Sequence, residues 1–388
     1  MYIPEKDRIV SLDMMRGFAI LGIFLVNMLS FHSPLLYLDP FSWWESDLDK
    51  GTYIFIDVFA QGSFYPLFSL LFGYGLVLLY ERTIKREQAF LSMATRRLLA
   101  LLFIGMVHAF FIWHGDILIT YAIFGFLFLL FRKLSGKAMM IMGALFWLIP
   151  NILLTLLFVV ALLLSPAGEL TMYEPELARQ SVEIYQQGSY FSIFHQRFED
   201  WYAVNNLANG VFMLFSIFPF FLIGGGAAKL KWMERVTELK KPFFISMLVF
   251  IIVGLFLKLS PYIVDRNIVY EYAQDTFGGP LLAFSYSLGI ALWAAKSNRV
   301  LKIFAPVGKM SMSNYLLQSI VSTLLFYSYG FGLYDQISAF WGTVLVVLIY
   351  ILQIVWSSYW LKNHYYGPVE WLWRSITYLK WPAWKRNN

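Results

Sequence analysis

Long runs of apolar residues dominate the chain, and polar residues are concentrated in the short segments between them. A helix needs ~20 predominantly apolar residues to cross the hydrocarbon core of a bilayer. Ten runs reach or approach that length, so the pattern predicts an all-α bundle of about ten transmembrane helices in one domain, residues 1–388. The predicted spans are 14–32, 54–80, 98–113, 116–131, 138–164, 207–228, 243–260, 278–295, 304–330 and 337–361.

The charges of the connecting loops alternate along the chain. Basic residues collect in the even-numbered loops and in the C-terminal tail at 362–388, whereas the first and fifth loops are acidic. Because Lys and Arg are enriched in cytoplasmic loops, both termini are predicted to be cytoplasmic. The fifth loop, at 165–206, is long, and the mixed helical spacing of its apolar residues predicts amphipathic helices on the outer membrane surface.

Composition narrows the class of protein further. Of the 388 residues, 59% are hydrophobic and 14% are charged, against roughly 25% charged in soluble domains, so a lipid bilayer is the expected surroundings. The chain has no cysteine, which excludes disulfides and thiolate metal sites. The net charge of +6 comes from loop residues that orient the protein, so no nucleic-acid partner is predicted.

The first predicted span has polar residues near both ends. Arg16 and His32 are separated by roughly 24 Å along a helix, so Arg16 is expected at the cytoplasmic end and His32 at the outer end. Arg16 is either an interfacial anchor paired with Asp13 or a cation for a phosphate-bearing ligand. His32 is either a solvated loop residue or part of a site, and Asn27 needs a polar partner in hydrocarbon. No small-residue cleavage site follows, so the span is predicted to be retained.

Three polar side chains of the second span, Asp57, Gln61 and Tyr65, are spaced to share one helix face. Asp57 is near the outer boundary, where water could solvate it. Gly62 and Pro66 favour a broken or re-entrant helix, which a membrane tolerates only against protein or a watery cavity.

The densest polar cluster is predicted at the turn between the third and fourth spans, where His108, His114 and Asp116 lie close in sequence and Tyr121 is one turn deeper. His114 and Asp116 are expected at the outer turn, where a carboxylate can orient an imidazole as a general base. Asp116 could instead cap the following helix. A metal site built from this cluster matches no familiar ligand spacing, so no metal is predicted.

The ninth span carries a polar stripe, Ser311, Asn314, Gln318 and Ser322, at spacings of three or four residues. Hydrogen bonds between helices explain such a stripe more simply than ligand contact does. The three glycines at 224–226 predict close packing of the sixth span.

Five stretches of the chain carry a resemblance to a known family. They are RIVSLDMMRGFAILGIFLVN at 8–27, FYPLFSLLFGYG at 64–75, HGDILITYAIFG at 114–125, PVGKMSMSNYLLQS at 306–319 and YYGPVEWLWR at 365–374. They resemble the YeiB-like bacterial membrane proteins, whose biochemical function is largely unassigned, and the last two stretches are the more specific. The resemblance covers nearly the whole chain and implies a multi-pass protein of the bacterial cytoplasmic membrane.

That family is similar, more remotely, to the transmembrane acyltransferases that include heparan-alpha-glucosaminide N-acetyltransferase. Those proteins carry an Arg-Gly pair on the first helix and an Asn and a His toward its outer end, where this chain has Arg16-Gly17, Asn27 and His32. The resemblance implies transfer of an acyl group from a cytoplasmic acyl-CoA to a glycan or lipid on the outer face. His114 with Asp116 competes with His32 as the base.

Acyl transfer from a thioester needs a base for the proton of the nucleophile, and neutral His suits that role at pH 7. Asn27 is expected to stabilise the oxyanion, and the acyl-CoA donor needs a cationic mouth. The candidates for that mouth are Arg16, Arg96 and Arg97. The other candidate substrate-binding residues are Asp57, Gln61, His108, Tyr121, Asn314 and Gln318.

Two other classes of function stay open. A proton-coupled transporter or permease would use Asp57, His108 and Asp116 as a path, since buried ionisable residues serve transport as readily as catalysis. A membrane sensor without turnover is the third class. Whether the chain forms a homo-oligomer also stays open.

Overall fold

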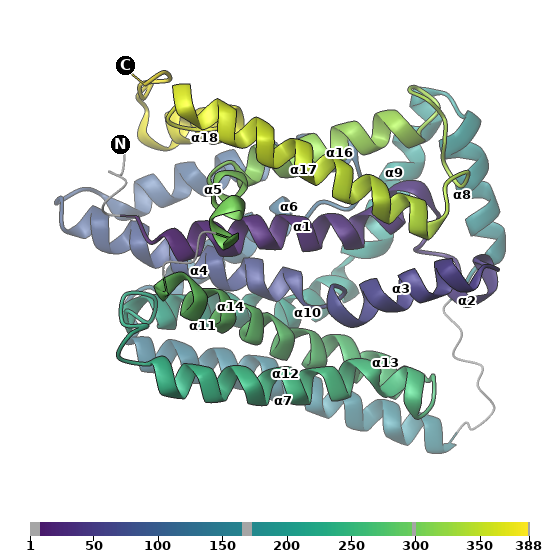
Figure 1. Cartoon of the computed structure of the whole chain (residues 1–388), viewed down its shortest axis with the longest axis horizontal. Coiled ribbons are helices and arrows are strands. Elements are labelled where there is room, and N and C mark those ends of the chain that lie inside the picture. Colours follow the sequence, from purple (N-terminus) through teal and green to yellow (C-terminus); the bar gives the residue numbers. More distant parts are fainter. Residues whose placement is uncertain (1–7, 165–172, 297–299, 387–388) are drawn as a thin grey trace.

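The computed structural model describes residues 8–164, 173–296 and 300–386, and these ranges form helices without a β-strand. The long helices run roughly along the longest axis of the molecule, side by side in one bundle (Figure 1). The helix α1 begins at the end of the bundle where α18 lies, and α2 and α8 lie at the opposite end (Figure 1). We call these the Arg16 end and the His32 end.

In the described ranges, eight helical segments are long and apolar enough to cross a membrane. This confirms the prediction of an all-α chain, and the length and apolar character of these segments suggest a membrane-embedded protein. The segments are α1 (Val10–His32), α3 with α4 (Asp47–Phe59 and Phe64–Ile84), α5 with the π-helix η2 (Phe90–Val107 and His108–Ile112), α7 (Gly136–Leu164), α10 with α11 (Leu207–Ser216 and Phe218–Lys229), α12 (Lys240–Ile263), α13 with the π-helix η3 and α14 (Ile268–Ala273, Gln274–Gly278 and Gly279–Ala295), and α17 (Ala339–Asn363).

Two shorter helices, α6 (Leu118–Phe131) and α16 (Ser311–Phe326), match the other two predicted spans. They measure roughly 21 and 24 Å, below the ~30 Å of a hydrocarbon core. Two helices occur in the predicted fifth loop, of which 165–172 lie outside the described residues, and α8 is the amphipathic one of the two. The remaining helices are α2 (Pro40–Trp43), α8 (Pro175–Gln187), α9 (Tyr190–Asn205), η4 (Val300–Ile303), α15 (Phe304–Lys309) and α18 (Pro368–Tyr378).

The second predicted span is broken, as its Gly and Pro content predicted. The helix α3 stops at Phe59 and α4 starts at Phe64, and Gly62 between them has φ of +70°, which favours glycine. The prediction that Asp57, Gln61 and Tyr65 share one helix face is wrong, because the break interrupts the helical spacing.

The ninth predicted span, 304–330, is shorter than expected. It is divided at Met310 into α15 and α16, and the chain leaves the helix at Tyr327, whose backbone is extended. The ring of Tyr327 stacks on Tyr185 of α8, with centroids 4.4 Å apart. Burial of this aromatic pair accounts for the early end of the helix.

Glycines bring the central helices close together. Gly224 of α11 lies against the backbone of Leu70 in α4, and Gly226 lies against Met140 of α7. A side chain at either glycine would collide, so the predicted close packing at 224–226 is confirmed. The helix α1 packs against α4, α14, α15, α16 and α17, which places its polar residues inside the bundle.

Candidate functional site

His108 is the centre of a hydrogen-bonded chain of three side chains near the His32 end. Its Nδ1 is 2.8 Å from Oδ1 of Asp116, and its Nε2 is 2.8 Å from Oγ of Ser319 on α16. All three residues are buried, with exposures of 0%, 7% and 1%. A carboxylate that fixes one ring nitrogen leaves the other able to exchange a proton with a hydroxyl.

The predicted pairing of Asp116 with His114 is wrong. The second carboxylate oxygen of Asp116 accepts the backbone N–H of Ile119, at 2.8 Å, in the first turn of α6. This bond confirms the alternative prediction of a capped turn. Because the carboxylate is held over the start of α6, its other oxygen faces His108 of η2.

His114 faces a different carboxylate, that of Asp200 in α9. The separation of 3.7 Å between Nδ1 and Oδ2 is too long for a hydrogen bond. Asp200 instead accepts the hydroxyls of Tyr37 and Tyr185, at 2.7 and 2.6 Å, and the side-chain amide of Gln196, at 2.7 Å. Burial lowers the pKa of His114, although the charge of Asp200 opposes the shift. Burial and the charge of Asp200 also raise the pKa of Tyr185, which keeps its proton on the hydroxyl.

His32 ends α1 and is completely buried, so its interpretation as a solvated loop residue is wrong. Its ring lies beside Trp44 and Phe326, and the lack of a side chain at Gly342 leaves room for it. Neither ring nitrogen has a hydrogen-bond partner among the described residues. An unpaired buried polar group costs about 1–3 kcal/mol, so His32 is kept as a candidate site residue. Asn27, on the same helix, is half-buried.

The three histidines surround one aromatic cluster at the His32 end. The ring centroid of Trp113 is 6.3 Å from that of His108 and 5.3 Å from that of His114. Phe326 belongs to the same cluster, and its ring centroid is 5.8 Å from that of His32. His108 and His114 are therefore neighbours around Trp113, and His32 borders the same cluster at Phe326, without direct hydrogen bonds among the three histidines.

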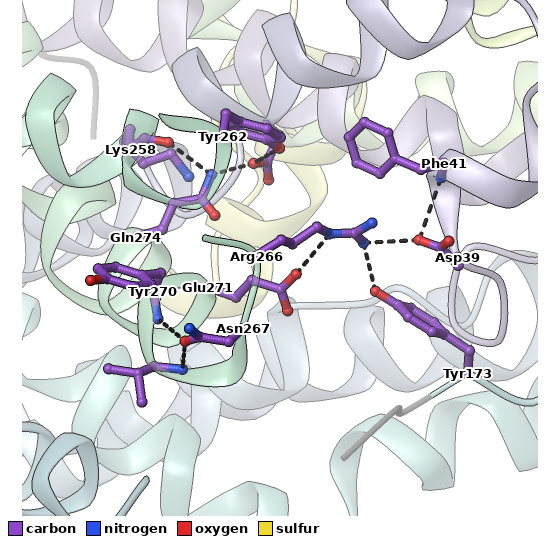
Figure 2. A network of polar contacts seen from close by, with 12 residues as sticks. Asp39, Phe41, Tyr173, Lys258, Tyr262, Arg266, Asn267, Tyr270, Glu271 and Gln274 are labelled. Carbon is purple, nitrogen blue, oxygen red and sulfur yellow. Dashed lines mark hydrogen bonds and ion pairs between the residues drawn. The ribbon is translucent and has the colours of Figure 1, made fainter. Parts of the chain in front are cut away.

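Asp57 of α3 belongs to a second polar network, whose other residues come from α12 and η3. Its carboxylate accepts the hydroxyl of Tyr262, at 2.5 Å, and the side-chain amide of Gln274. Lys258 is completely buried and forms an ion pair with Asp275, with 2.7 Å between Nζ and Oδ1. Gln274 lies between Lys258 and Tyr262 (Figure 2). Asp57 is only 6% exposed, so the expectation that water solvates it is wrong.

Arg266 joins three segments beside this network. Its guanidinium donates to Asp39, at 2.9 Å, to the hydroxyl of Tyr173, at 2.7 Å, and to Glu271 of α13, at 3.0 Å (Figure 2). Partial burial would raise the pKa of Asp39, but the hydrogen bond and charge of Arg266 lower it. These bonds connect three segments, which are the loop after α1, the short stretch that leads into α8, and α13.

Three other predicted site residues, Tyr121, Asn314 and Gln318, form hydrogen bonds between helices. The hydroxyl of Tyr121 lies 2.8 Å from Ser69 Oγ and donates to the carbonyl of Tyr65, which joins α6 to α4. Asn314 and Gln318 bond to α17, at 3.0 and 2.9 Å, as the hydrogen-bond interpretation of the stripe predicted. Gln61 lies half-buried in the break between α3 and α4.

Basic side chains gather at the Arg16 end. Asp13 pairs with both Arg8 and Arg16, at 3.0 and 3.1 Å, which confirms the predicted pair of Asp13 and Arg16. The guanidinium of Arg97 lies 3.6 Å from the ring centroid of Trp373. Arg96 donates to the carbonyl of residue 377 at 3.1 Å, which ties α5 to α18.

Two arginines at this end, Arg82 of α4 and Arg97 of α5, keep their charge without a carboxylate partner in the described part of the chain. Arg82 and Arg97 are half-buried and have no ion pair among the described residues. The positive charge of Arg374 acts on both of them and on Arg16. Like charges at short range repel, so this arginine cluster (Arg8, Arg16, Arg82, Arg97 and Arg374) favours an anion.

The chain is similar over almost its whole length to two bacterial proteins. It is 34% identical to "Uncharacterized protein YxaH" of Bacillus subtilis (strain 168), over 97% of this chain and 96% of that protein. It is 30% identical to "Uncharacterized protein YeiB" of Escherichia coli (strain K12), over 96% of each chain. The chain belongs to the YeiB-like family. Residues 227–380 also match the family described as "Protein of unknown function (DUF418)".

The two most specific motifs of this YeiB-like chain contact each other. Glu370 of α18 accepts the backbone N–H groups of Met312 and Ser313, at 2.7 and 3.0 Å, and the hydroxyl of Ser313 at 2.5 Å. A carboxylate at a helix N-terminus satisfies free N–H groups. Glu370 therefore caps α16, which has no side-chain cap of its own.

Sequence reasoning missed several residues of these networks, and Ser319, Lys258 and Asp200 are three examples. Ser319 is adjacent to the predicted stripe, and only the fold shows that it faces His108. Lys258 lies inside a predicted span, where a lone lysine is itself a signal of a functional or paired site. Asp200 is in the fifth loop, and nothing in its sequence context distinguishes it from a solvated acid.

Proposed function

We propose that this YeiB-like protein is a membrane-embedded acyltransferase that moves an acyl group from a cytoplasmic acyl-CoA-like donor to a glycan or lipid acceptor on the outer face. One observation carries the proposal. His108 is fully buried with Asp116 on one ring nitrogen and a hydroxyl on the other, at 2.8 Å each. This is the arrangement that a general base for acyl transfer needs.

In this mechanism His108 acts as the base and Asp116 as a positioning residue. An acceptor hydroxyl or amine takes the place of the Ser319 hydroxyl at Nε2 and gives its proton to the ring. The acceptor atom attacks the thioester carbonyl carbon, the carbon–sulfur bond breaks, and the CoA thiolate leaves. Asp116 stabilises the imidazolium during the step, and the imidazolium returns a proton to the thiolate.

His32 is a second candidate for proton transfer, since both of its nitrogens are buried and without a partner among the described residues. Asn27 would stabilise the oxyanion through its side-chain amide. His114 is less suited to the role of base, because Asp200 is already occupied by two hydroxyls and an amide. In this proposal His114 lines the acceptor side.

The arginine cluster supports a phosphate-bearing donor at the opposite end. Arg82 and Arg97 offer guanidinium groups without an ion pair among the described residues, and guanidinium matches the geometry of phosphate oxygens. The proposed topology has ten spans, with α6 and α16 as the two short ones, and both termini in the cytoplasm. The basic loops support this orientation in the bacterial cytoplasmic membrane.

A proton-coupled transporter is the second candidate function, and the Asp57 network favours it. The buried ammonium of Lys258 pairs with Asp275, and Asp57 is bonded to Tyr262 and Gln274, so two carboxylates and one ammonium belong to the same network. The Asp57 network lies beside the break between α3 and α4. It also includes residues of η3, the π-helix between α13 and α14. Broken helices and buried charges are typical of transport sites.

Equilibrium binding separates the two functions. The proposal expects purified protein to bind acetyl-CoA or a longer acyl-CoA, and Arg97→Gln to weaken that binding about tenfold, the effect of ~1.4 kcal/mol. Lys85→Gln, at an exposed basic residue, serves as the matched control. Absence of binding by every acyl-CoA, together with proton-driven solute uptake that depends on Asp57, would establish the transporter instead.

A further inference from the structure

A cavity of about 430 Å³ lies between α1, α4, α7, α11, α12 and α14. This volume is within the ~300–1,000 Å³ typical of small-molecule sites. The cavity is separate from both the histidine cluster and the Asp57 network. Along α12 it extends from Pro242 to Phe250, which is roughly 12 Å of helix length.

The wall of the cavity is apolar. Trp147, Phe243, Phe250 and Phe284 supply aromatic surface, and the few hydroxyls are largely occupied elsewhere. The hydroxyl of Ser287 donates to a backbone carbonyl at 2.9 Å. That of Tyr74 donates to Glu234 at 2.7 Å. A polar occupant would lose its hydrogen bonds to water without replacement, so the wall selects hydrocarbon.

The cavity also reaches the loop between α11 and α12 at the Arg16 end. Trp232, Met233 and Leu239, which line it, belong to the loop between α11 and α12. Residues 229–241 contain five basic and two acidic residues. Of the two acids, Glu234 accepts from Tyr74 and Glu238 pairs with Arg235. The rim is therefore cationic, and its exposed lysines are Lys231, Lys240 and Lys241.

We infer that this cavity binds one hydrocarbon chain of an anionic phospholipid, whose phosphate lies at the rim lysines. The apolar wall matches the chain and the cationic rim matches the headgroup. Lys and Arg near a membrane surface attract anionic lipid. The flanking helices α7 and α12 bury few of their own residues, so the site is next to the bilayer that supplies the lipid. The inference is independent of acyl transfer.

Photolabelling of the full chain in mild detergent tests this inference. The probes are phosphatidylglycerol and phosphatidylcholine that carry the same diazirine-bearing acyl chain, and peptide mass spectrometry maps the labelled residues. We expect phosphatidylglycerol to label the cavity wall. Ser246→Phe, which fills the cavity from α12, is expected to reduce that label about tenfold, or ~1.4 kcal/mol of binding.

The matched control is Val249→Phe, which adds the same ring to α12 at a half-exposed position outside the cavity wall. It is expected to leave the label unchanged. Ser287→Leu fills the cavity from α14 and is expected to reduce the label as well, so the inference stays testable if Ser246→Phe does not fold. Replacement of Lys231 and Lys241 by Gln is expected to remove the preference for phosphatidylglycerol.

Three results would overturn the inference. One is label spread evenly over the exposed apolar surface and unchanged in both filled variants. Another is equal labelling of the wall by phosphatidylcholine. The third is labelling by a photoreactive acyl-CoA in place of phosphatidylglycerol, which would assign the cavity to the donor of the acyl-transfer reaction.

Discussion

At the scale of single residues, Asp116 combines two functions in one carboxylate. One oxygen caps α6 through Ile119 and the other orients His108. The sequence suggested both functions, but it paired the carboxylate with His114, two positions away. Only the direction of the capping bond determines which imidazole the carboxylate faces, and spacing along the chain does not carry that information.

Asp116→Asn is expected to lower the rate of acyl transfer by about 10²–10⁴-fold, the usual contribution of general acid–base catalysis. An amide can still cap α6, but it cannot stabilise the imidazolium of His108. The measurement is release of CoA thiol over time. Asp47→Asn, at an exposed acid near the His32 end, is the control. Equal rates in the two variants would show that Asp116 has no part in the reaction.

The pH dependence of stability tests the burial of His114. Burial lowers its pKa, so the unfolded chain takes up a proton at about pH 6.5 that the folded chain does not bind. Stability is therefore expected to fall as the pH is lowered below ~6.5. His114→Gln is expected to weaken this dependence in thermal unfolding at pH 7.5 and 5.0, whereas His195→Gln, at an exposed histidine, is not. An unchanged pH dependence in His114→Gln would contradict the assignment.

At the scale of helices, hydrophobic length predicted most of the elements and composition predicted one break. Gly62 and Pro66 indicated the division between α3 and α4, because both residues disturb a regular helix. The early end of α16 was not predictable in the same way. Gly330 and Gly332 indicate an end to the helix by that point, but the turn comes earlier, at Tyr327, whose ring packs on a distant helix.

Gly62→Ala tests the break between α3 and α4. The positive φ disfavours any other residue by about 1–2 kcal/mol, and the new methyl group would approach Asp275. We expect a lower melting temperature in detergent. Gly51→Ala is the contrast, since a methyl group there meets open space on α3, and it is expected to stabilise the helix by about 0.5–1 kcal/mol. A Gly62→Ala protein that melts like the wild type would argue against the strained turn.

At the scale of the whole molecule, apolar runs and loop charges predicted a membrane-embedded helix bundle, and the fold confirms its all-α class. The clustering of His32, His108 and His114 was not predictable, because it depends on how α1, η2 and α9 pack around Trp113. Lys258 and Asp275 are likewise brought together by helix packing across a π-helix.

The orientation in the membrane can be read from single cysteines, since the chain contains none of its own. Glu87→Cys and Lys231→Cys are expected to be protected from a membrane-impermeant maleimide in intact cells and to react after the membrane is opened. Ser46→Cys, at the other end, is expected to react in intact cells. All three positions are exposed. The reverse pattern would place the termini outside.

The central claim is that His108 serves as the base of an acyltransferase. Its most direct test is the rate at which the purified, bilayer-reconstituted protein releases CoA from acyl-CoA in the presence of bacterial membrane lipids and glycans, with His108→Gln compared to the wild type. We predict release by the wild type and a loss of about 10²–10⁴-fold in His108→Gln, with acyl-CoA binding retained. Release at the same rate in both proteins, or no release by the wild type, would contradict the account.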